Sequence, residues 1–229
     1  MDRSTSPKSP FCDRRDAGRQ LARELAVYAG RPDVLVLALP RGGVPVAYEI
    51  ALALDAPLDV LLVRKLGVPG REELALGALA AGGFRFLNEE VVRRLHIPPH
   101  VIDAVTAAER KELQRRKRAY RGNRRPPQVR GKIVILVDDG VATGASLRAA
   151  LAVLRQARPV RIVVAVPVAS AETCDEVRDE VDEVICACSP EPFFSVGHWY
   201  EDFSQTSDEE VRDLLGWSAC RESTVPPKR

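Results

Sequence analysis

The chain has 229 residues, of which 45% are hydrophobic, so it can bury one substantial core without disulfide bonds. Its formal net charge of only +2 at pH 7 gives no general attraction for nucleic acids or membranes, and its five cysteines form no Cys-x-x-Cys pair that would indicate a zinc site. Residues 1–10 lack the apolar segment of a signal peptide and no apolar run is long enough to span a bilayer, so a cytoplasmic protein is predicted.

Both ends, residues 1–10 and 218–229, are rich in Ser, Pro and charge and are predicted to be disordered. Between them, runs of Val, Ile and Leu alternate with helical patterns. Nearly continuous hydrophobicity is typical of strands that are covered on both faces. The predicted fold class is therefore α/β, an open parallel sheet flanked by helices. The predicted strands are 34–39, 59–63, 132–137, 161–166 and 183–187, and the predicted helices are 13–29, 44–54, 145–157, 170–181 and 207–215.

The segment 74–130 interrupts this alternation. Asn88 is a candidate N-cap, and a long charged helix is predicted over residues 99–120. We therefore predict one domain over residues 11–217 that contains an insertion or lid at about residues 74–130.

Two short basic stretches follow the first two predicted strands. Arg41-Gly42-Gly43 stands between a strand and a helix, and taken alone it is typical of an ordinary turn. Arg64 and Lys65 stand at the end of the next strand, where two cations suit a pyrophosphate. A solvated basic turn explains those two residues equally well.

Two adjacent carboxylates, Asp138 and Asp139, follow the predicted strand 132–137 and precede a loop of small residues that ends at Ser146. Small residues let successive backbone N–H groups converge on an anion, and the start of the next helix reinforces that attraction. Thr143 adds a hydroxyl donor. Carboxylates at the carboxyl end of a parallel strand can accept hydrogen bonds from a vicinal diol. The pattern predicts a sugar-phosphate site, and it lacks the glycine spacing of a P-loop or a dinucleotide-binding fingerprint.

Residues 134–146, Val-Ile-Leu-Val-Asp-Asp-Gly-Val-Ala-Thr-Gly-Ala-Ser, resemble the signature of type I phosphoribosyltransferases, which use 5-phosphoribosyl 1-pyrophosphate. Residues 39–43, Leu-Pro-Arg-Gly-Gly, look like the pyrophosphate loop of that family, in which a cis peptide is expected at Arg41–Gly42 or a neighbouring bond. Arg64-Lys65 is similar to the Arg-Lys loop of adenine and orotate phosphoribosyltransferases. Over the whole chain the better match is to predicted phosphoribosyltransferases whose acceptor is not established.

The resemblance implies transfer of the phosphoribosyl group to a nitrogen heterocycle with release of pyrophosphate. Because the transition state has oxocarbenium character, the site must supply positioning and charge. Mg²⁺ is the implied cofactor, bound mainly through the substrate, and a homodimer is the implied assembly. The implied ribose 5-phosphate residues are Asp138, Asp139, Gly140, Val141, Ala142, Thr143, Gly144, Ala145 and Ser146; those for pyrophosphate are Arg41, Gly42, Gly43, Arg64 and Lys65; the catalytic residues are Asp138, Asp139 and Lys65.

An aromatic run, Pro-Glu-Pro-Phe-Phe-Ser at residues 190–195, is close to one in adenine phosphoribosyltransferases and predicts a hood over residues 188–206. Phe193, Phe194 and Trp199 are predicted to contact the acceptor, because planar bases stack on aromatic rings. Core packing of Phe193 or Phe194 is the alternative. Ala142 stands where 6-oxopurine enzymes carry an acidic residue, so adenine is favoured over hypoxanthine and guanine.

A regulator that binds phosphoribosyl pyrophosphate or a nucleotide and contacts RNA or DNA is the second hypothesis. Residues 110–125 carry nine basic side chains, which are expected to face only the acids Glu109 and Glu112. Such a stripe can neutralise nucleic-acid phosphates. A solvated helix face, or a lid that closes over pyrophosphate, explains the stripe as well. These two interpretations are favoured because the net charge of the whole chain is close to zero. The enzyme is the preferred interpretation.

Overall fold

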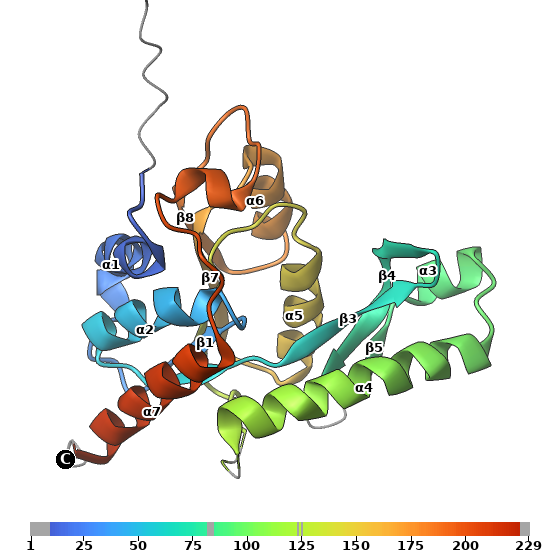
Figure 1. The fold of residues 1–229 in the computed structure, drawn as a ribbon, viewed down its shortest axis with the longest axis horizontal. Helices are drawn as coiled ribbons and strands as arrows, with labels where there is room; N and C mark the ends of the chain where they lie inside the picture. Colours follow the sequence, from blue (N-terminus) through green and yellow to red (C-terminus); the bar gives the residue numbers. More distant parts are fainter. Residues whose placement is uncertain (1–9, 82–84, 123, 125, 225–229) are drawn as a thin grey trace, which may run out of the picture.

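The computed structural model describes residues 10–81, 85–122, 124 and 126–224. Its centre is a five-stranded parallel sheet in the order β2-β1-β6-β7-β8, which confirms the predicted fold class (Figure 1). The predicted disordered N-terminus lies outside the described residues except for Pro10. The strands are β1 (Val34–Ala38), β2 (Leu58–Val60), β6 (Ile133–Val137), β7 (Arg161–Val168) and β8 (Glu183–Cys188).

Both faces of the sheet are covered because neighbouring residues of each strand point into different cores. In β1, Val34 and Val36 pack with α1, α2 and α7, whereas Leu35 and Leu37 pack with α5 and α6. All five residues of β1 and of β6 are buried, which explains their unbroken apolar sequences. The helices are α1 (Arg14–Glu24), α2 (Gly43–Leu54), α5 (Ala145–Gln156), α6 (Ala171–Arg178) and α7 (Asp208–Thr224).

The insertion is larger than predicted and begins earlier. The predicted strand 59–63 leaves the parallel sheet after Val60, and Val63 instead pairs with Ala80 in a separate antiparallel sheet. Arg64 and Lys65 therefore lie within a strand and not in a loop after one. Figure 1 shows this sheet and the long helix α4 projecting to one side of the parallel sheet. The insertion contains β3 (Val63–Val68), β4 (Arg71–Ala80), β5 (Arg85–Leu87), α3 (Glu89–Arg94) and α4 (Pro99–Arg121).

The C-terminal region is also more ordered than predicted. Helix α7 continues to Thr224, so the prediction that residues 218–229 are disordered is wrong for residues 218–224. Ser218 is buried, and the Trp217 ring lies 6.3 Å from the ring of Tyr48 on α2. These tertiary contacts stabilise a polar sequence as a helix. Residues 225–229 lie outside the described part, and no described helix is both long and apolar enough to cross a bilayer.

Candidate active site

The two carboxylates lie at the carboxyl end of β6, where the sequence predicts a ligand site. Asp138 is partly buried, and its pKa is raised well above its ordinary value because burial, followed by the charge of Asp139, disfavours the ionised form. The Oδ1 atom of Asp138 accepts a hydrogen bond from the backbone N–H of Asp139 at 2.9 Å. The first carboxylate is thus held beside the second.

The glycines after β1 allow a second backbone segment to approach these acids. A Cβ atom on Gly43 would lie 2.7 Å from the Val137 carbonyl oxygen and 3.0 Å from the Asp138 Cα atom. A Cβ atom on Gly42 would lie 1.9 Å from a carboxylate oxygen of Asp139. The expected cis peptide lies at Pro40–Arg41, next to these glycines. The structure therefore brings the predicted pyrophosphate loop and the acidic pair into direct contact.

Arg14 contacts the second carboxylate, a role that the sequence analysis missed. Its Nε atom lies 2.8 Å from Oδ2 of Asp139, and its Nη1 atom donates to the Ser204 carbonyl at 2.7 Å. The guanidinium also lies over the Phe203 ring, 3.9 Å from its centroid. The Tyr200 hydroxyl donates to the Asp139 carbonyl oxygen at 2.5 Å. Because Arg14 is 125 residues from Asp139, no local pattern pointed to this pair.

The loop after the acids is held by hydrogen bonds to β7 and α6, and several of its side chains are exposed to solvent. The N–H of Val141 donates to the Val168 carbonyl at 2.8 Å, and the Thr173 hydroxyl donates to the Ala142 carbonyl at 2.9 Å. Gly144 precedes α5 with a φ of +70°, a conformation that favours glycine. The side chains of Ala142, Thr143 and Ser146 are exposed. The loop can therefore meet a ligand from solvent while its path is set by β7 and α6.

A cavity of about 610 Å³, here called the Asp138 cavity, opens beside the acids. Asp138 and Ser146 line it from the parallel sheet side, and Arg64 and Lys65 line it from β3. Residues of α4 also line it. The structure thus brings together four residues that the sequence analysis assigned to two different groups of the donor substrate.

Other predicted site residues lie beside the Asp138 cavity and do not line it. The Arg41 Nη1 atom lies 3.7 Å from Oδ1 of Asp208, the first residue of α7. Asp208 also accepts hydrogen bonds from Tyr120 at 2.5 Å and Arg115 at 2.8 Å, both on α4. The pyrophosphate loop is therefore linked to the insertion through α7.

The predicted hood contains the aromatic residues, but none of the three predicted acceptor contacts lines the Asp138 cavity. Phe193 and Trp199 are partly buried against a small core, whereas the Phe194 side chain is 69% exposed. Val196 packs closely against Gly140, so the hood contacts the loop that follows the acids. Of the three predicted acceptor contacts, Phe194 is therefore the most exposed to solvent.

The basic stripe of α4 has more acidic neighbours than its own sequence indicates. Arg115 pairs with Asp208 of α7, and Arg121 pairs with Asp59 at 2.9 Å while remaining buried. The expectation that only Glu109 and Glu112 face the stripe is therefore wrong, because the tertiary structure adds acids from other elements. Arg125 lies outside the described residues. Ion pairs within the protein weaken the case for a continuous nucleic-acid surface.

Comparisons with known proteins identify the family of the chain. Two Mycobacterium tuberculosis proteins, from strains CDC 1551 and H37Rv and provisionally named phosphoribosyl transferases, are each 46% identical over 227 residues. The matches cover 96% of this chain but 51% of each relative, so the chain spans about half the length of these curated relatives.

Solved structures show the same fold. TT1426 of Thermus thermophilus superposes with a TM-score of 0.82 at 45% identity and covers 90% of this chain and 97% of that one. The AQ2163 protein of Aquifex aeolicus, 15% identical with a TM-score of 0.50 over 88% of this chain and 84% of its own, shares the fold. The family model described as the phosphoribosyl transferase domain matches residues 14–201. The chain therefore belongs to the phosphoribosyl transferase domain family and has the type I fold.

Proposed function

We propose that the chain transfers the 5-phosphoribosyl group from 5-phosphoribosyl 1-pyrophosphate to a nitrogen heterocycle and releases pyrophosphate. The observation that carries this proposal is the shared Asp138 cavity, in which an aspartate, a serine and a lysine, namely Asp138, Ser146 and Lys65, line one space. A ribose diol, a 5-phosphate and a pyrophosphate require those three kinds of group. Membership of the family supports the transferase class.

The site residues divide into groups that contact different parts of the donor substrate. Asp138 and Asp139 accept hydrogen bonds from the ribose hydroxyls, and the loop 140–146 donates backbone and hydroxyl groups to the 5-phosphate. The loop 41–43, together with Arg64 and Lys65, holds the pyrophosphate. Arg14 is a positioning residue, because its ion pair with Asp139 fixes the direction of that carboxylate.

The reaction breaks the bond between the anomeric carbon and a pyrophosphate oxygen and forms a bond from that carbon to a ring nitrogen of the acceptor. The proton of the acceptor nitrogen passes to water, and pyrophosphate leaves with the bonding electron pair. Positive side chains beside the leaving oxygen stabilise the charge that develops there. Holding both substrates in line supplies most of the remaining acceleration.

Magnesium fits this site through the substrate. Within the described residues, no group of three or more His, Cys, Asp or Glu side chains is arranged to hold a metal ion by itself. Mg²⁺ prefers oxygen ligands and commonly retains only one or two carboxylates besides substrate oxygens. Asp138, which lines the Asp138 cavity, would hold the ion, because the other acidic lining residue, Glu109, is paired with Arg64, and the ion would neutralise pyrophosphate charge.

A screen of nucleobases with 5-phosphoribosyl 1-pyrophosphate and Mg²⁺, measured as pyrophosphate release, tests the proposed function. We expect release that depends on the base, with adenine as the first candidate. The control is the same screen with a variant that carries both Asp138→Asn and Asp139→Asn. Binding of the donor without release by any heterocycle would contradict an enzymatic role and favour the regulator.

The acceptor assignment has its own test in a matched pair of phenylalanines. Because Phe194 is exposed, we expect Phe194→Ala to raise the KM for the acceptor about tenfold or more, as the loss of a stacked ring costs about 1 to 3 kcal/mol. Phe193 packs against a core, so Phe193→Ala should mainly lower stability. An unchanged acceptor KM in Phe194→Ala would remove Phe194 from the acceptor site.

A further inference from the structure

One face of α4 forms a wall of the Asp138 cavity. The lining residues from this helix are Val105, Ala108, Glu109 and Arg116. Their spacing of three, four and eleven residues from Val105 places them along a single helical face. The insertion helix is therefore part of the proposed site and not a distant addition to it.

The side chains on this wall favour an anionic ligand. Arg64, Lys65 and Arg116 supply three cations to the Asp138 cavity, and Glu109 and Asp138 supply its two carboxyl groups. Glu109 pairs with Arg64 at 2.5 Å, whereas Arg116 pairs with Glu112, which does not line the Asp138 cavity. The lining therefore has one more cationic than acidic side chain, and its cations come from β3 and α4.

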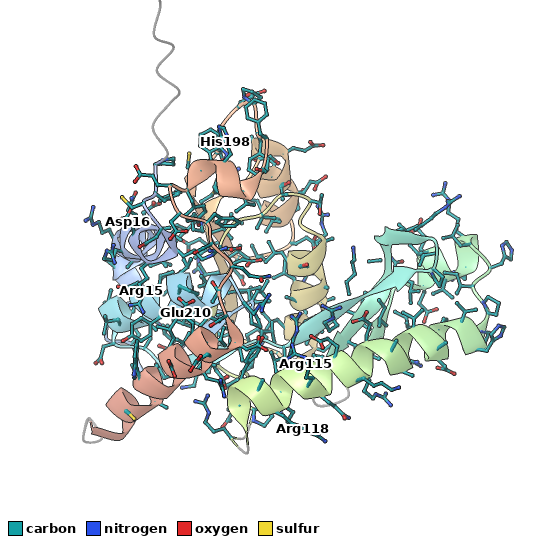
Figure 2. All side chains as sticks on the ribbon, viewed as in Figure 1. Arg15, Asp16, Arg115, Arg118, His198 and Glu210 are labelled. Atoms are coloured by element: carbon teal, nitrogen blue, oxygen red, sulfur yellow. The ribbon has the colours of Figure 1, made fainter. Side chains whose placement is uncertain are left out.

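Three arginines of α4 that are alike in sequence occupy different environments. Arg115 contacts Asp208 on α7, Arg116 lines the Asp138 cavity, and Arg118 is exposed. In Figure 2, Arg118 lies on the outer side of α4, whereas Arg115 lies on the side that faces α7. Of these three side chains, only Arg116 is placed to meet a ligand of the proposed enzyme.

We propose that Arg116 binds the pyrophosphate group of the donor substrate as a third cation beside Arg64 and Lys65. The inference rests on the proposed function, because it assigns this part of the Asp138 cavity to the leaving group. A guanidinium suits this role since its planar donors match two phosphate oxygens at once. The Arg116 Nε atom donates to Glu112 at 2.8 Å, and this contact orients the side chain from the preceding helical turn.

Substitution of Arg116 disturbs little else. Glu112 also accepts hydrogen bonds from Arg115, at 2.8 Å from Nε and 3.0 Å from Nη2, so it keeps a partner when Arg116 is replaced. Arg118→Gln is the matched control, since it removes the same charge from the same helix two residues away. Two residues correspond to about 200° around an α-helix. The pair separates a direct contact from a general loss of positive charge.

The test measures binding of inorganic pyrophosphate, 5-phosphoribosyl 1-pyrophosphate and ribose 5-phosphate by calorimetry, with Mg²⁺ present throughout. We expect Arg116→Gln to weaken the first two ligands about tenfold to a hundredfold, as for one charge-assisted hydrogen bond. Ribose 5-phosphate should bind unchanged, since it lacks the leaving group. Arg118→Gln should leave all three affinities within about twofold, and Arg116→Lys should recover part of the loss.

The outcomes distinguish this inference from the proposed function. Unchanged pyrophosphate affinity in a folded Arg116→Gln variant, or an equal loss in Arg118→Gln, overturns the role of Arg116 while donor binding by the unaltered chain still stands. An equal loss of ribose 5-phosphate affinity in Arg116→Gln also overturns it, because the residue would then act on the whole site. If the unaltered chain binds pyrophosphate through Arg116 but neither phosphoribosyl compound, the proposed function and the assignment of Arg116 to the donor substrate are both wrong.

Discussion

The two sides of the Asp138 cavity are built in different ways. On the sheet side, Gly43 packs directly against the backbone of Val137 and Asp138, so the geometry is set by main-chain contacts. On the insertion side, β3 and α4 share buried apolar residues such as Leu66 and Leu113, but at the cavity they present partly exposed charged side chains, such as the pair Arg64–Glu109. Close backbone packing tolerates no added atom, whereas a partly exposed ion pair is worth little. Substitutions on the sheet side should therefore have the larger effects.

The largest expected effect is loss of donor binding when both sheet-side acids are replaced. Asp138→Asn combined with Asp139→Asn should abolish measurable binding of 5-phosphoribosyl 1-pyrophosphate, since each charge-assisted hydrogen bond contributes about 1.5 to 3 kcal/mol. Calorimetry gives the affinity, and circular dichroism checks the fold. The control is Asp213→Asn, at an exposed position of α7. A folded double variant with unaltered affinity would remove the acids from the site.

The second largest expected effect is a loss of stability when a side chain is added to Gly43 on the sheet side. Gly43→Ala should lower the free energy of unfolding by about 1 to 3 kcal/mol, because the added Cβ would lie 2.7 Å from the Val137 carbonyl oxygen. Gly216→Ala on α7 is the control, since no neighbour lies within 4 Å of its Cβ position. That change should stabilise the chain by about 0.5 to 1 kcal/mol. Denaturant unfolding measures both, and shifts of the same sign would refute the packing argument.

A third prediction uses the pKa of the sheet-side acid. The raised pKa of Asp138 means that the folded state binds its proton more tightly than the unfolded state does, so ionisation costs stability as pH rises. Asp138→Asn should therefore raise Tm at pH 7, and the gain should shrink as pH falls toward the ordinary value of an Asp. Each unit of pKa shift corresponds to about 1.4 kcal/mol. A gain that is independent of pH would show that ionisation is not its cause.

The smallest effect should come from the contact between α7 and the insertion, where the pKa of an acid is lowered and its loss should therefore reduce stability. Hydrogen bonds from Tyr120 and Arg115 lower the pKa of Asp208, so its ionised form stabilises the folded state above the ordinary Asp pKa. Asp208→Asn should lower the free energy of unfolding at pH 7 by at most about 1 kcal/mol, as for other partly exposed pairs. Thermal unfolding across pH should show the loss fading as pH falls through the lowered pKa. A larger loss at acid pH than at neutral pH would contradict this mechanism.

The sheet side and the insertion side of the Asp138 cavity also differ in how well their structure could be predicted from sequence. The order of strand, acidic pair, loop and helix around Asp138 was predicted correctly because its causes are local, namely an unbroken apolar run and a helix that begins after Gly144. The strand Val63–Val68 was missed because its partner is β4 and its sequence places Arg64 and Lys65 side by side. Helix α7 was predicted too short because Ser218 is buried by other elements.

By itself the sequence determined the α/β class, the parallel strands and the place of the acidic loop, since apolar runs and small residues act over neighbouring positions. Only the tertiary structure decided which distant groups meet there. It paired Arg14 with Asp139 and placed Arg116 in the Asp138 cavity while leaving Arg118 exposed. The physical reason is that all basic residues of a helix look alike in sequence, whereas their roles depend on which helical face packs against another element.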